Sequence, residues 1–127
     1  KRSLHRDLKT DNVMVGDFGE VYLLDWGVAI ELDEKGERKI DQFCGTLCFA
    51  APEMLSSSIP LTRRTDVYLL GCILHEILTL ELRHQGDSLK ELIDKRIEEH
   101  KPSFQLILSA DEYTKLKQEF FDQCQNG

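Results

Sequence analysis

The sequence predicts a mainly α-helical domain that carries one short β-hairpin. Residues 66–82 contain no proline and are apolar at most positions, a pattern typical of a helix buried on nearly every face. Ser88 and Ser109 are each followed three residues later by glutamate, which is the signature of a capped helix start. Two short runs rich in apolar and β-branched residues, with a glycine-containing connection between them, predict the hairpin.

The hairpin is expected near the start of the chain. Residues 13–15 form its first strand and residues 21–24 its second, because β-branched, aromatic and large apolar residues favour strands. Gly16 and Gly19 lie between the two runs and supply the backbone freedom that a tight connection needs. The triplet Asp17-Phe18-Gly19 is therefore predicted at the tip of the hairpin.

Each of the two capped segments carries one apolar stripe with helical spacing. The first stripe, ahead of Pro102, consists of Leu89, Leu92, Ile93 and Ile97, and the second consists of Tyr113, Leu116 and Phe120. We expect both segments to be helices that pack one face against the core.

Length, composition and charge limit the classes of function. The 127 residues are enough for one domain with its own core, and their apolar content of 41% is ordinary for a globular protein. The formal net charge of -7 argues against nucleic acids and anionic membranes as partners. No apolar run approaches the length of a membrane span, so we expect no membrane segment in this chain.

The cysteines indicate the cellular compartment. Cys44, Cys48, Cys72 and Cys124 have neither the spacing of zinc ligands nor that of a disulfide framework. We therefore expect a reduced, zinc-free, cytoplasmic protein.

The run His5-Arg6-Asp7-Leu8-Lys9-Thr10-Asp11-Asn12 is the strongest functional signal in the chain. Asp25-Trp26-Gly27 follows, with its aspartate thirteen residues after Asn12. A carboxylate can orient a hydroxyl, a lysine can neutralise a phosphate, and amide and carboxylate oxygens suit Mg²⁺. These residue types at these intervals indicate phosphoryl transfer.

Two further signals follow in the segment of residues 45–53 and at Asp66. Pro52 pre-sets the start of a helix, and Glu53 adds a carboxylate to its first turn. Asp66 stands at the start of the long apolar segment, where the helix dipole favours a carboxylate. Helix capping alone would explain each of these features if it stood by itself.

Taken together, these motifs resemble those of the eukaryotic-type Ser/Thr protein kinases, and bacterial members in particular. The specific resemblance covers residues 3–82. It implies the C-terminal lobe of a protein kinase with a short hairpin at the catalytic cleft, residues 1–127 being a partial kinase domain whose N-terminal lobe is absent. The implied activity is ATP-dependent phosphorylation of Ser/Thr in protein substrates, with ATP and Mg²⁺ as cofactors.

The resemblance implies roles for the residues of the motifs. Asp7 would accept the proton of the substrate hydroxyl, Lys9 would contact the transferring phosphate, and Asn12 and Asp25 would hold Mg²⁺. Further implied site residues are Met14 in the ATP pocket, Thr46 as a partner of Asp7 and Lys9, and the supporting residues His5, Arg6, Trp26, Gly27, Glu53 and Asp66. Ile73 and Ile77 match positions that support the adenine pocket.

Asp17-Phe18-Gly19 spells the commoner form of the family's metal motif. It begins only five residues after Asn12, which leaves no room for two strands between them. We therefore assign the metal-binding role to Asp25 and predict only a turn at Asp17.

The chain departs from the family pattern at several positions. Thr10 replaces the usual proline. Residues 28–45 contain no Ser, Thr or Tyr, so we expect no requirement for phosphorylation there; Asp41 could pair with Arg6, or the acids of this stretch could form a solvated loop. In the family, the glutamate at the position of Glu53 pairs with an arginine much later in the chain, but no arginine follows Arg96. Glu53 is therefore either paired differently, or its partner lies in residues that this sequence does not include.

Alternative functions remain open from the sequence. The chain could be a non-catalytic kinase-like remnant or an interaction module, or a small-molecule phosphotransferase of the aminoglycoside type. Lys9, Ala51-Pro52-Glu53 and Asp66 favour the protein kinase. Because the N-terminal lobe would be a required partner, we expect the isolated chain to be inactive.

Overall fold

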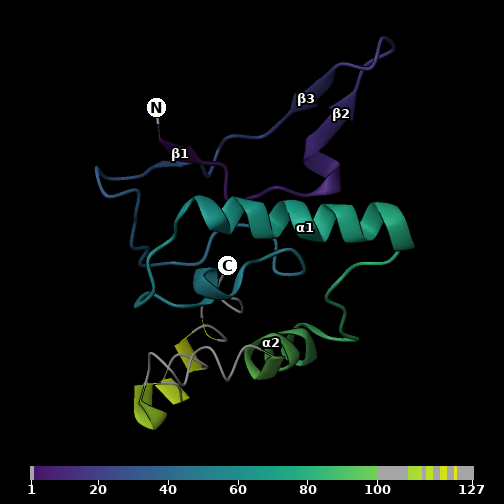
Figure 1. The fold of residues 1–127 in the computed structure, drawn as a ribbon. Helices are drawn as coiled ribbons and strands as arrows, with labels where there is room; N and C mark the ends of the chain where they lie inside the picture. The colour runs from purple at the N-terminus through teal and green to yellow at the C-terminus, as the bar shows by residue number, and fades with distance from the viewer. Residues whose placement is uncertain (1, 100–108, 113, 116–117, 120–121, 123–127) are drawn as a thin grey trace.

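The computed structural model describes residues 2–99, 109–112, 114–115, 118–119 and 122, and the structural statements below concern these residues. Within residues 2–99 the secondary structure consists of two small antiparallel sheets, two α-helices and two short 3₁₀ helices (Figure 1). Residues 110–112, 114–115, 118–119 and 122 are also helical. In chain order the elements are β1 (Ser3–Leu4), η1 (Thr10–Asn12), β2 (Val13–Val15), β3 (Val21–Leu23), β4 (Ile30–Glu31), η2 (Pro52–Leu55), α1 (Arg63–Thr79) and α2 (Leu89–Glu99).

The strands pair as two separate antiparallel ladders. β1 pairs with β4, and β2 pairs with β3 so that Met14 lies opposite Tyr22. The predicted hairpin is thereby confirmed. Gly16 N–H donates to the Glu20 carbonyl at 2.8 Å, and Gly19 takes a φ of 85°, so the predicted connection closes between the two strands.

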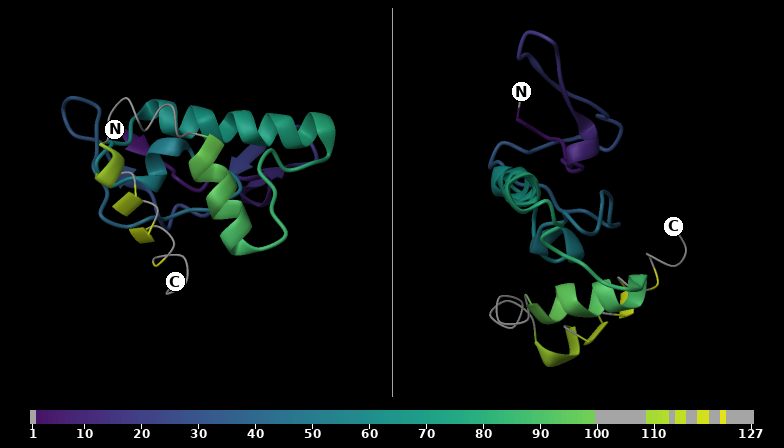
Figure 2. Two further views of the ribbon diagram at one scale, coloured as in Figure 1. Left: turned by 90° about the horizontal axis from the view of Figure 1, so that it is seen from below. Right: turned by 90° about the vertical axis from the view of Figure 1, so that its right-hand side faces the viewer.

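Helix α1 lies between two layers of the molecule. The view along its axis has the hairpin and β1 on one side, and η2 and α2 on the other (Figure 2, right). The helix starts after Thr62, whose side chain accepts a hydrogen bond from the Arg64 N–H, and ends at Leu80 in a left-handed conformation. The helix is thus confirmed, but it lies about one turn earlier than the predicted residues 66–82 because Thr62 provides the cap.

The prediction that this helix is buried on nearly every face is wrong for the described residues. Leu69, Cys72 and Ile73 are buried, whereas a second set of its apolar side chains is between 52% and 74% exposed. This exposed set comprises Val67, Leu70, Leu74, Ile77 and Leu78. Among the described residues none packs closely enough against this side of the helix to bury it. The apolar residues on all sides of the helix therefore do not by themselves show which sides are buried.

The core lies mainly on the other side of α1. Its buried members come from the strands, from the 45–55 region, from α1 and from α2, and include Leu4, Leu8, Phe49, Ala50, Ala51, Met54, Leu55, Leu61, Leu69, Ile93 and Ile97. Ile93 and Ile97 are at most 1% exposed and Leu92 is half-buried, which confirms these three members of the predicted stripe on α2. Burial of this apolar surface is the main force that holds α2 to the molecule.

The two predicted capping boxes differ in their geometry. Ser109 and Glu112 exchange two hydrogen bonds, from the Ser109 N–H to the carboxylate at 2.7 Å and from the Glu112 N–H to the hydroxyl at 3.3 Å. Ser88 accepts from the Glu91 N–H at 3.1 Å, but the Glu91 carboxylate accepts from the Asp87 N–H. The apolar face predicted at Tyr113, Leu116 and Phe120 lies outside the described residues.

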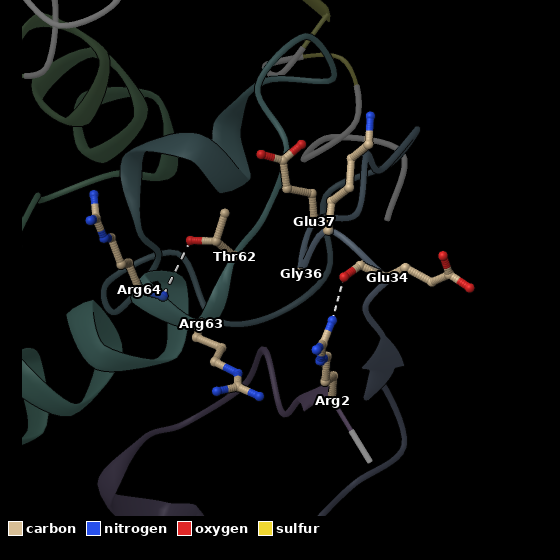
Figure 3. A pocket seen from close by; sticks show the side chains of 8 residues that line it. Arg2, Glu34, Gly36, Glu37, Thr62, Arg63 and Arg64 are labelled. Carbon is tan, nitrogen blue, oxygen red and sulfur yellow. Dashed lines mark hydrogen bonds between the residues drawn. The ribbon is translucent and has the colours of Figure 1, made fainter.

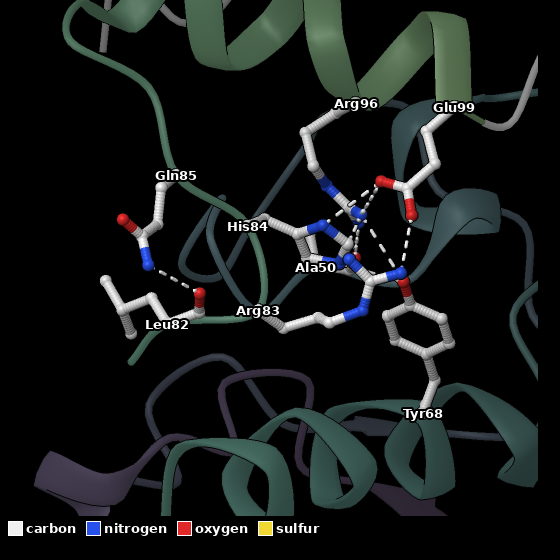
Figure 4. A network of polar contacts seen from close by, with 8 residues as sticks. All are labelled: Ala50, Tyr68, Leu82, Arg83, His84, Gln85, Arg96 and Glu99. Carbon is white, nitrogen blue, oxygen red and sulfur yellow. Dashed lines mark hydrogen bonds and ion pairs between the residues drawn. The ribbon is translucent and has the colours of Figure 1, made fainter. Parts of the chain in front are cut away.

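A buried polar network ties α2 to α1 and to the 45–53 segment (Figure 4). Arg96, 1% exposed, donates to the Ala50 carbonyl, to the Tyr68 hydroxyl at 3.3 Å and to His84 Nε2 at 2.5 Å. His84 Nδ1 lies 3.2 Å from the Glu99 carboxylate. Burial raises the pKa of Tyr68, whose hydroxyl lies 3.0 Å from His84 Nε2.

Other features of the described residues bear on the expectations above. No described helix combines the length and the apolarity that a membrane span requires. Cys44, Cys48 and Cys72 are free thiols, and burial raises the pKa of Cys72, whereas Cys124 lies outside the described part of the chain. Among the described residues no group of three or more His, Cys, Asp or Glu side chains could hold a metal ion.

Candidate active site

Asp7 lies at the centre of a cluster of polar side chains. The Thr46 hydroxyl donates to Asp7 Oδ1 at 2.7 Å, and Lys9 Nζ donates to the same hydroxyl at 3.0 Å. Lys9 Nζ also lies 3.6 Å from Asp7 Oδ2. Three of the predicted site residues, from two segments that are far apart in the sequence, are thus brought together in the arrangement that the resemblance implies.

The loop of residues 5–12 is anchored to α1 through its backbone. The Asp66 carboxylate accepts from the His5 N–H at 2.7 Å and from the Arg6 N–H at 3.0 Å. Arg6 has a φ of 69°, a conformation that side chains other than glycine take only at a cost of about 1–2 kcal/mol. Both oxygens of one carboxylate therefore stabilise a strained turn next to Asp7.

The His5 ring links the 5–12 loop to the segment around Asp25. Its ring packs edge-on against Trp26 with 4.7 Å between ring centroids, and Nε2 lies 2.8 Å from the Leu24 carbonyl. Because Nδ1 accepts from the Asp7 N–H at 3.2 Å, the ring proton belongs on Nε2, which then donates to Leu24. His5 thus connects Asp7 to the residues that precede Asp25.

Asp25 follows directly after the hairpin. The Leu24 N–H donates to the Asn12 carbonyl at 2.8 Å, so the backbones of Asn12 and Leu24 are neighbours. Asp25 has a φ of 54°, and its carboxylate accepts from the Gly27 N–H at 3.3 Å. Asp17 instead lies exposed in the connection between β2 and β3, where the sequence predicted a turn.

The side chain of Asn12 is oriented by Asp7. Its Nδ2 donates to the Asp7 carbonyl at 2.8 Å and lies 3.4 Å from Asp7 Oδ2. These contacts use the amide nitrogen and leave Oδ1 available as a hard oxygen ligand. The donor set of Asn12 Oδ1 and the Asp25 carboxylate therefore fits Mg²⁺ better than it fits a softer metal.

Met14, Ile73 and Ile77 differ in their exposure. Met14 is 56% exposed on β2, and Ile77 is 61% exposed on α1, while Ile73 is buried. Glu53 Oε1 accepts from the Thr65 hydroxyl at 2.7 Å, which gives this carboxylate a local partner within the described residues.

Arg6 has a backbone partner instead of the acid considered from the sequence. Its Nε donates to the Val28 carbonyl, and the residue is 9% exposed. Asp41 is exposed, and within the described part of the chain it makes no ion pair with Arg6. The solvated-loop interpretation of Asp41 therefore fits the structure.

Two contributions to the site were not predicted from the sequence. The Thr10 hydroxyl donates to Glu76 Oε2 at 2.9 Å, so α1 holds the 5–12 loop at a second point. Gly45 has a φ of 123°, and a Cβ at this position would lie 2.7 Å from the Arg6 carbonyl oxygen. A threonine in place of the family's proline was a visible signal for the first contact, but nothing in the sequence near Gly45 identified Arg6 as its neighbour.

Replacing Thr10 with valine in the full-length protein is expected to lower the free energy of unfolding by about 1–2 kcal/mol, because the half-buried Glu76 loses a donor. Chemical denaturation followed by circular dichroism measures this change. Thr10→Ser keeps the hydroxyl and is expected to lose less than half as much. A larger loss in Thr10→Ser than in Thr10→Val would show that the methyl group, and not the hydrogen bond, stabilises this contact.

A separate pocket of 610 Å³ lies beside the start of α1 (Figure 3). Its lining is strongly charged and comprises Arg2, Glu34, Lys35, Gly36, Glu37, Thr62, Arg63 and Arg64. Arg2 donates to the Glu34 carbonyl, and the side chain of Arg64 points away from these two residues. None of the predicted site residues lines this pocket, which is therefore distinct from the Asp7 cluster.

Comparison with known proteins agrees with the geometry. Residues 1–126 match the protein kinase domain family. Serine/threonine-protein kinase PknD of Protochlamydia amoebophila is 37% identical over 108 residues, covering 72% of this chain and 11% of that protein. Sperm motility kinase 3A of Mus musculus is 39% identical over 108 residues, covering 85% of this chain and 21% of that protein. The chain thus spans between 11% and 21% of the length of these two relatives.

The family match extends over nearly the whole chain, and it includes each of the motifs that gather around Asp7. The chain belongs to the protein kinase domain family, and within it to the eukaryotic-type Ser/Thr protein kinases.

Proposed function

We propose that residues 1–127 form the C-terminal lobe of a kinase domain, and that the full-length protein phosphorylates Ser/Thr in protein substrates with ATP and Mg²⁺. The cluster of Asp7, Lys9 and Thr46 is the observation that carries this proposal. Its carboxylate and its ammonium group are the two charged groups that transfer of a phosphoryl group to a hydroxyl requires.

In this proposal each member of the cluster has one task. Asp7 orients the substrate hydroxyl and accepts its proton, because the Thr46 hydroxyl and the Asn12 amide fix the carboxylate. Lys9, 3.6 Å from that carboxylate, stabilises the negative charge of the transferring phosphoryl group. Asn12 Oδ1 and the Asp25 carboxylate would hold Mg²⁺, which supplies positive charge to the phosphates of ATP.

The remaining parts of the ATP site are proposed to come from an N-terminal lobe. Met14, which the resemblance assigns to the ATP pocket, is 56% exposed, so the described residues do not enclose a nucleotide there. We therefore propose that the isolated chain is inactive and binds ATP weakly. The proposed setting is cytoplasmic, with protein substrates as partners.

The proposal is tested with the full-length protein, radiolabelled ATP and a mixture of protein substrates. Phosphate is expected on Ser and Thr, as found by phosphoamino-acid analysis. Lys9→Met is expected to lower kcat by about 10²-fold, because it removes the charge that faces the phosphate. Lys9→Arg keeps the charge and is expected to retain more of the activity.

Two outcomes would contradict the proposal. A full-length protein that transfers no phosphate to any protein would be a non-catalytic remnant. Labelling of small molecules without labelling of proteins would favour the small-molecule phosphotransferase instead.

A further inference from the structure

The pocket of 610 Å³ beside the start of α1 has an excess of positive charge. Four of the side chains that line it are basic and two are acidic, although the whole chain has a formal net charge of -7. The basic side chains are those of Arg2, Lys35, Arg63 and Arg64. Positive charge is thus gathered here against the overall charge of the molecule, which favours an anionic ligand.

The basic side chains of the pocket have no acidic partner in the described part of the chain. None of the four forms an ion pair with another described residue. Within the same residues the Arg2 guanidinium donates to one backbone group, the Glu34 carbonyl, and the carboxylates of Glu34 and Glu37 also form no ion pair. Most of the N–H donors that line the pocket are therefore free to bind a ligand.

Arg63 and Arg64 also stand in the first turn of α1, where the helix dipole disfavours a basic side chain. Residues that oppose a local preference without a compensating contact are concentrated at functional positions. Figure 3 shows the Arg63 side chain extending to the side of the pocket where Arg2 lies, whereas Arg64 points the other way. Arg2 and Arg63 are therefore the two guanidinium groups placed to share one ligand.

The segments that form the walls of the pocket are joined through their backbones. The Leu32 N–H donates to the Arg2 carbonyl at 2.7 Å. Arg38 and Leu61 exchange two backbone hydrogen bonds, of 3.0 Å and 2.7 Å. These bonds hold residues 32–38 between the start of the chain and the residues that precede α1, so the walls are in place before a ligand binds.

The turn of residues 33–37 is closed by the side chain of Asp33. Its Oδ1 accepts from the Lys35 N–H and from the Glu37 N–H, both at 2.9 Å. The bond from Glu37 is the main cause that lowers the pKa of Asp33, so the carboxylate is charged at neutral pH and keeps both bonds. Lys35 is thus presented from a fixed turn, which reduces the conformational entropy that is lost on binding.

A phosphate monoester fits these donors better than a carboxylate does. Its charge at neutral pH, about -1.5 to -2, matches an excess of two positive charges, and guanidinium groups bind phosphate oxygens through paired hydrogen bonds. The Thr62 hydroxyl accepts from the Arg64 N–H at 3.2 Å and donates to no described residue, so it can donate to a phosphate oxygen. The pocket is larger than a phosphate group alone and also has room for the residue that carries it.

We propose that this pocket binds the phosphate of a phosphoserine or phosphothreonine in a polypeptide. Arg2 and Arg63 bind the phosphate oxygens, Lys35 adds positive charge, and the Thr62 hydroxyl donates a hydrogen bond. The proposal goes beyond the proposed kinase function, which would produce such residues, and the binding itself needs no phosphoryl transfer at Asp7. The phosphorylated residue belongs to another segment of the full-length protein or to a separate protein.

The test uses the full-length protein and two fluorescein-labelled peptide pools of random sequence around a fixed central residue. This residue is phosphothreonine in one pool and glutamate in the other. Fluorescence anisotropy without ATP is expected to show binding of the phosphothreonine pool that is at least about tenfold tighter than binding of the glutamate pool. The affinity is expected to fall between about pH 7.5 and about pH 5.5, because the phosphate loses its second charge near pH 6.

Three variants locate the binding in the pocket. Arg63→Gln is expected to weaken binding about tenfold, and its melting temperature is expected not to fall, since a basic residue leaves the first turn of α1. Glu37→Gln removes a negative charge from the lining and is expected to tighten binding about twofold to threefold, which a merely structural role of the pocket would not produce. Arg38→Gln is the matched control, because Arg38 is exposed and does not line the pocket, and it is expected to change the affinity by less than about twofold.

Phosphatase treatment of the protein distinguishes the two sources of the phosphate. If the phosphorylated residue lies in the same protein, the phosphorylated protein binds the pool only after this treatment, whereas for a separate protein it binds equally before and after. Equal affinity for the two pools would overturn the proposal, as would equal losses in Arg63→Gln and Arg38→Gln. An active kinase that binds neither pool, before or after phosphatase treatment, would overturn this proposal alone. A protein that binds the phosphothreonine pool but phosphorylates no protein would overturn the kinase function alone.

Discussion

Asp25→Asn in the full-length protein is expected to lower kcat by about 10³-fold or more, because it removes a charged ligand from the proposed Mg²⁺ site. Asp25 has a left-handed backbone conformation, with a φ of 54°, and it directly follows Leu24, whose N–H is hydrogen-bonded to the Asn12 carbonyl. Asparagine tolerates this conformation, so the fold is expected to be kept and the loss to reflect the charge. Steady-state phosphorylation assays at several Mg²⁺ concentrations measure the effect.

Asp17→Asn is the internal control for this experiment. Asp17 belongs to a triplet with the commoner spelling of the metal motif, but it lies exposed between β2 and β3. Its substitution is expected to change kcat by no more than about threefold. Equal damage from the two substitutions would mean that the metal-binding aspartate has been assigned wrongly.

Gly45→Ala is expected to lower the free energy of unfolding by about 3–5 kcal/mol and to abolish most of the activity. An added Cβ would lie 2.7 Å from the Arg6 carbonyl oxygen and 3.1 Å from Met54 Cε. The φ of 123° lies outside the left-handed region that alanine can reach. The 5–12 loop would have to move away, which would displace Asp7 from Thr46.

Gly36→Ala separates backbone strain from the close approach. Gly36 also has a positive φ, of 82°, but beyond its chain neighbours no atom lies within 4 Å of the position that an added Cβ would take. Its substitution is expected to cost only about 1–2 kcal/mol and to leave kcat nearly unchanged. Denaturation curves and kcat for both variants test this, and similar losses at the two positions would exclude the contact with Arg6 as the cause.

The parts of the fold that could be predicted from the sequence are those with local signals. The hairpin followed from strand propensity and two glycines, and the start of α2 followed from its capping residues. The long apolar segment predicted the start of α1 to within about a turn. The contact of Thr46 with Asp7 and Lys9 could be predicted because these residues match family motifs whose arrangement in space is known.

The features that could not be predicted depend on contacts between distant segments. Thr10 meets Glu76 across 66 residues, and Gly45 meets the carbonyl of Arg6, with no periodicity that links either pair. The exposure of Leu74 and Ile77 was also missed, since an apolar pattern reports what a helix can bury and not what lies against it.

Helix α1 and the 5–12 loop are expected to unfold together when the structure opens locally. Asp66 and Glu76 are ten residues apart on one helix, or about 15 Å along its axis, and each holds a different end of the loop. Opening of the helix would release His5 and Thr10 at the same time, so the two segments form one cooperative unit. How exactly the loop positions Asp7 then depends on the stiffness of a continuous helix rather than on the few contacts within the loop.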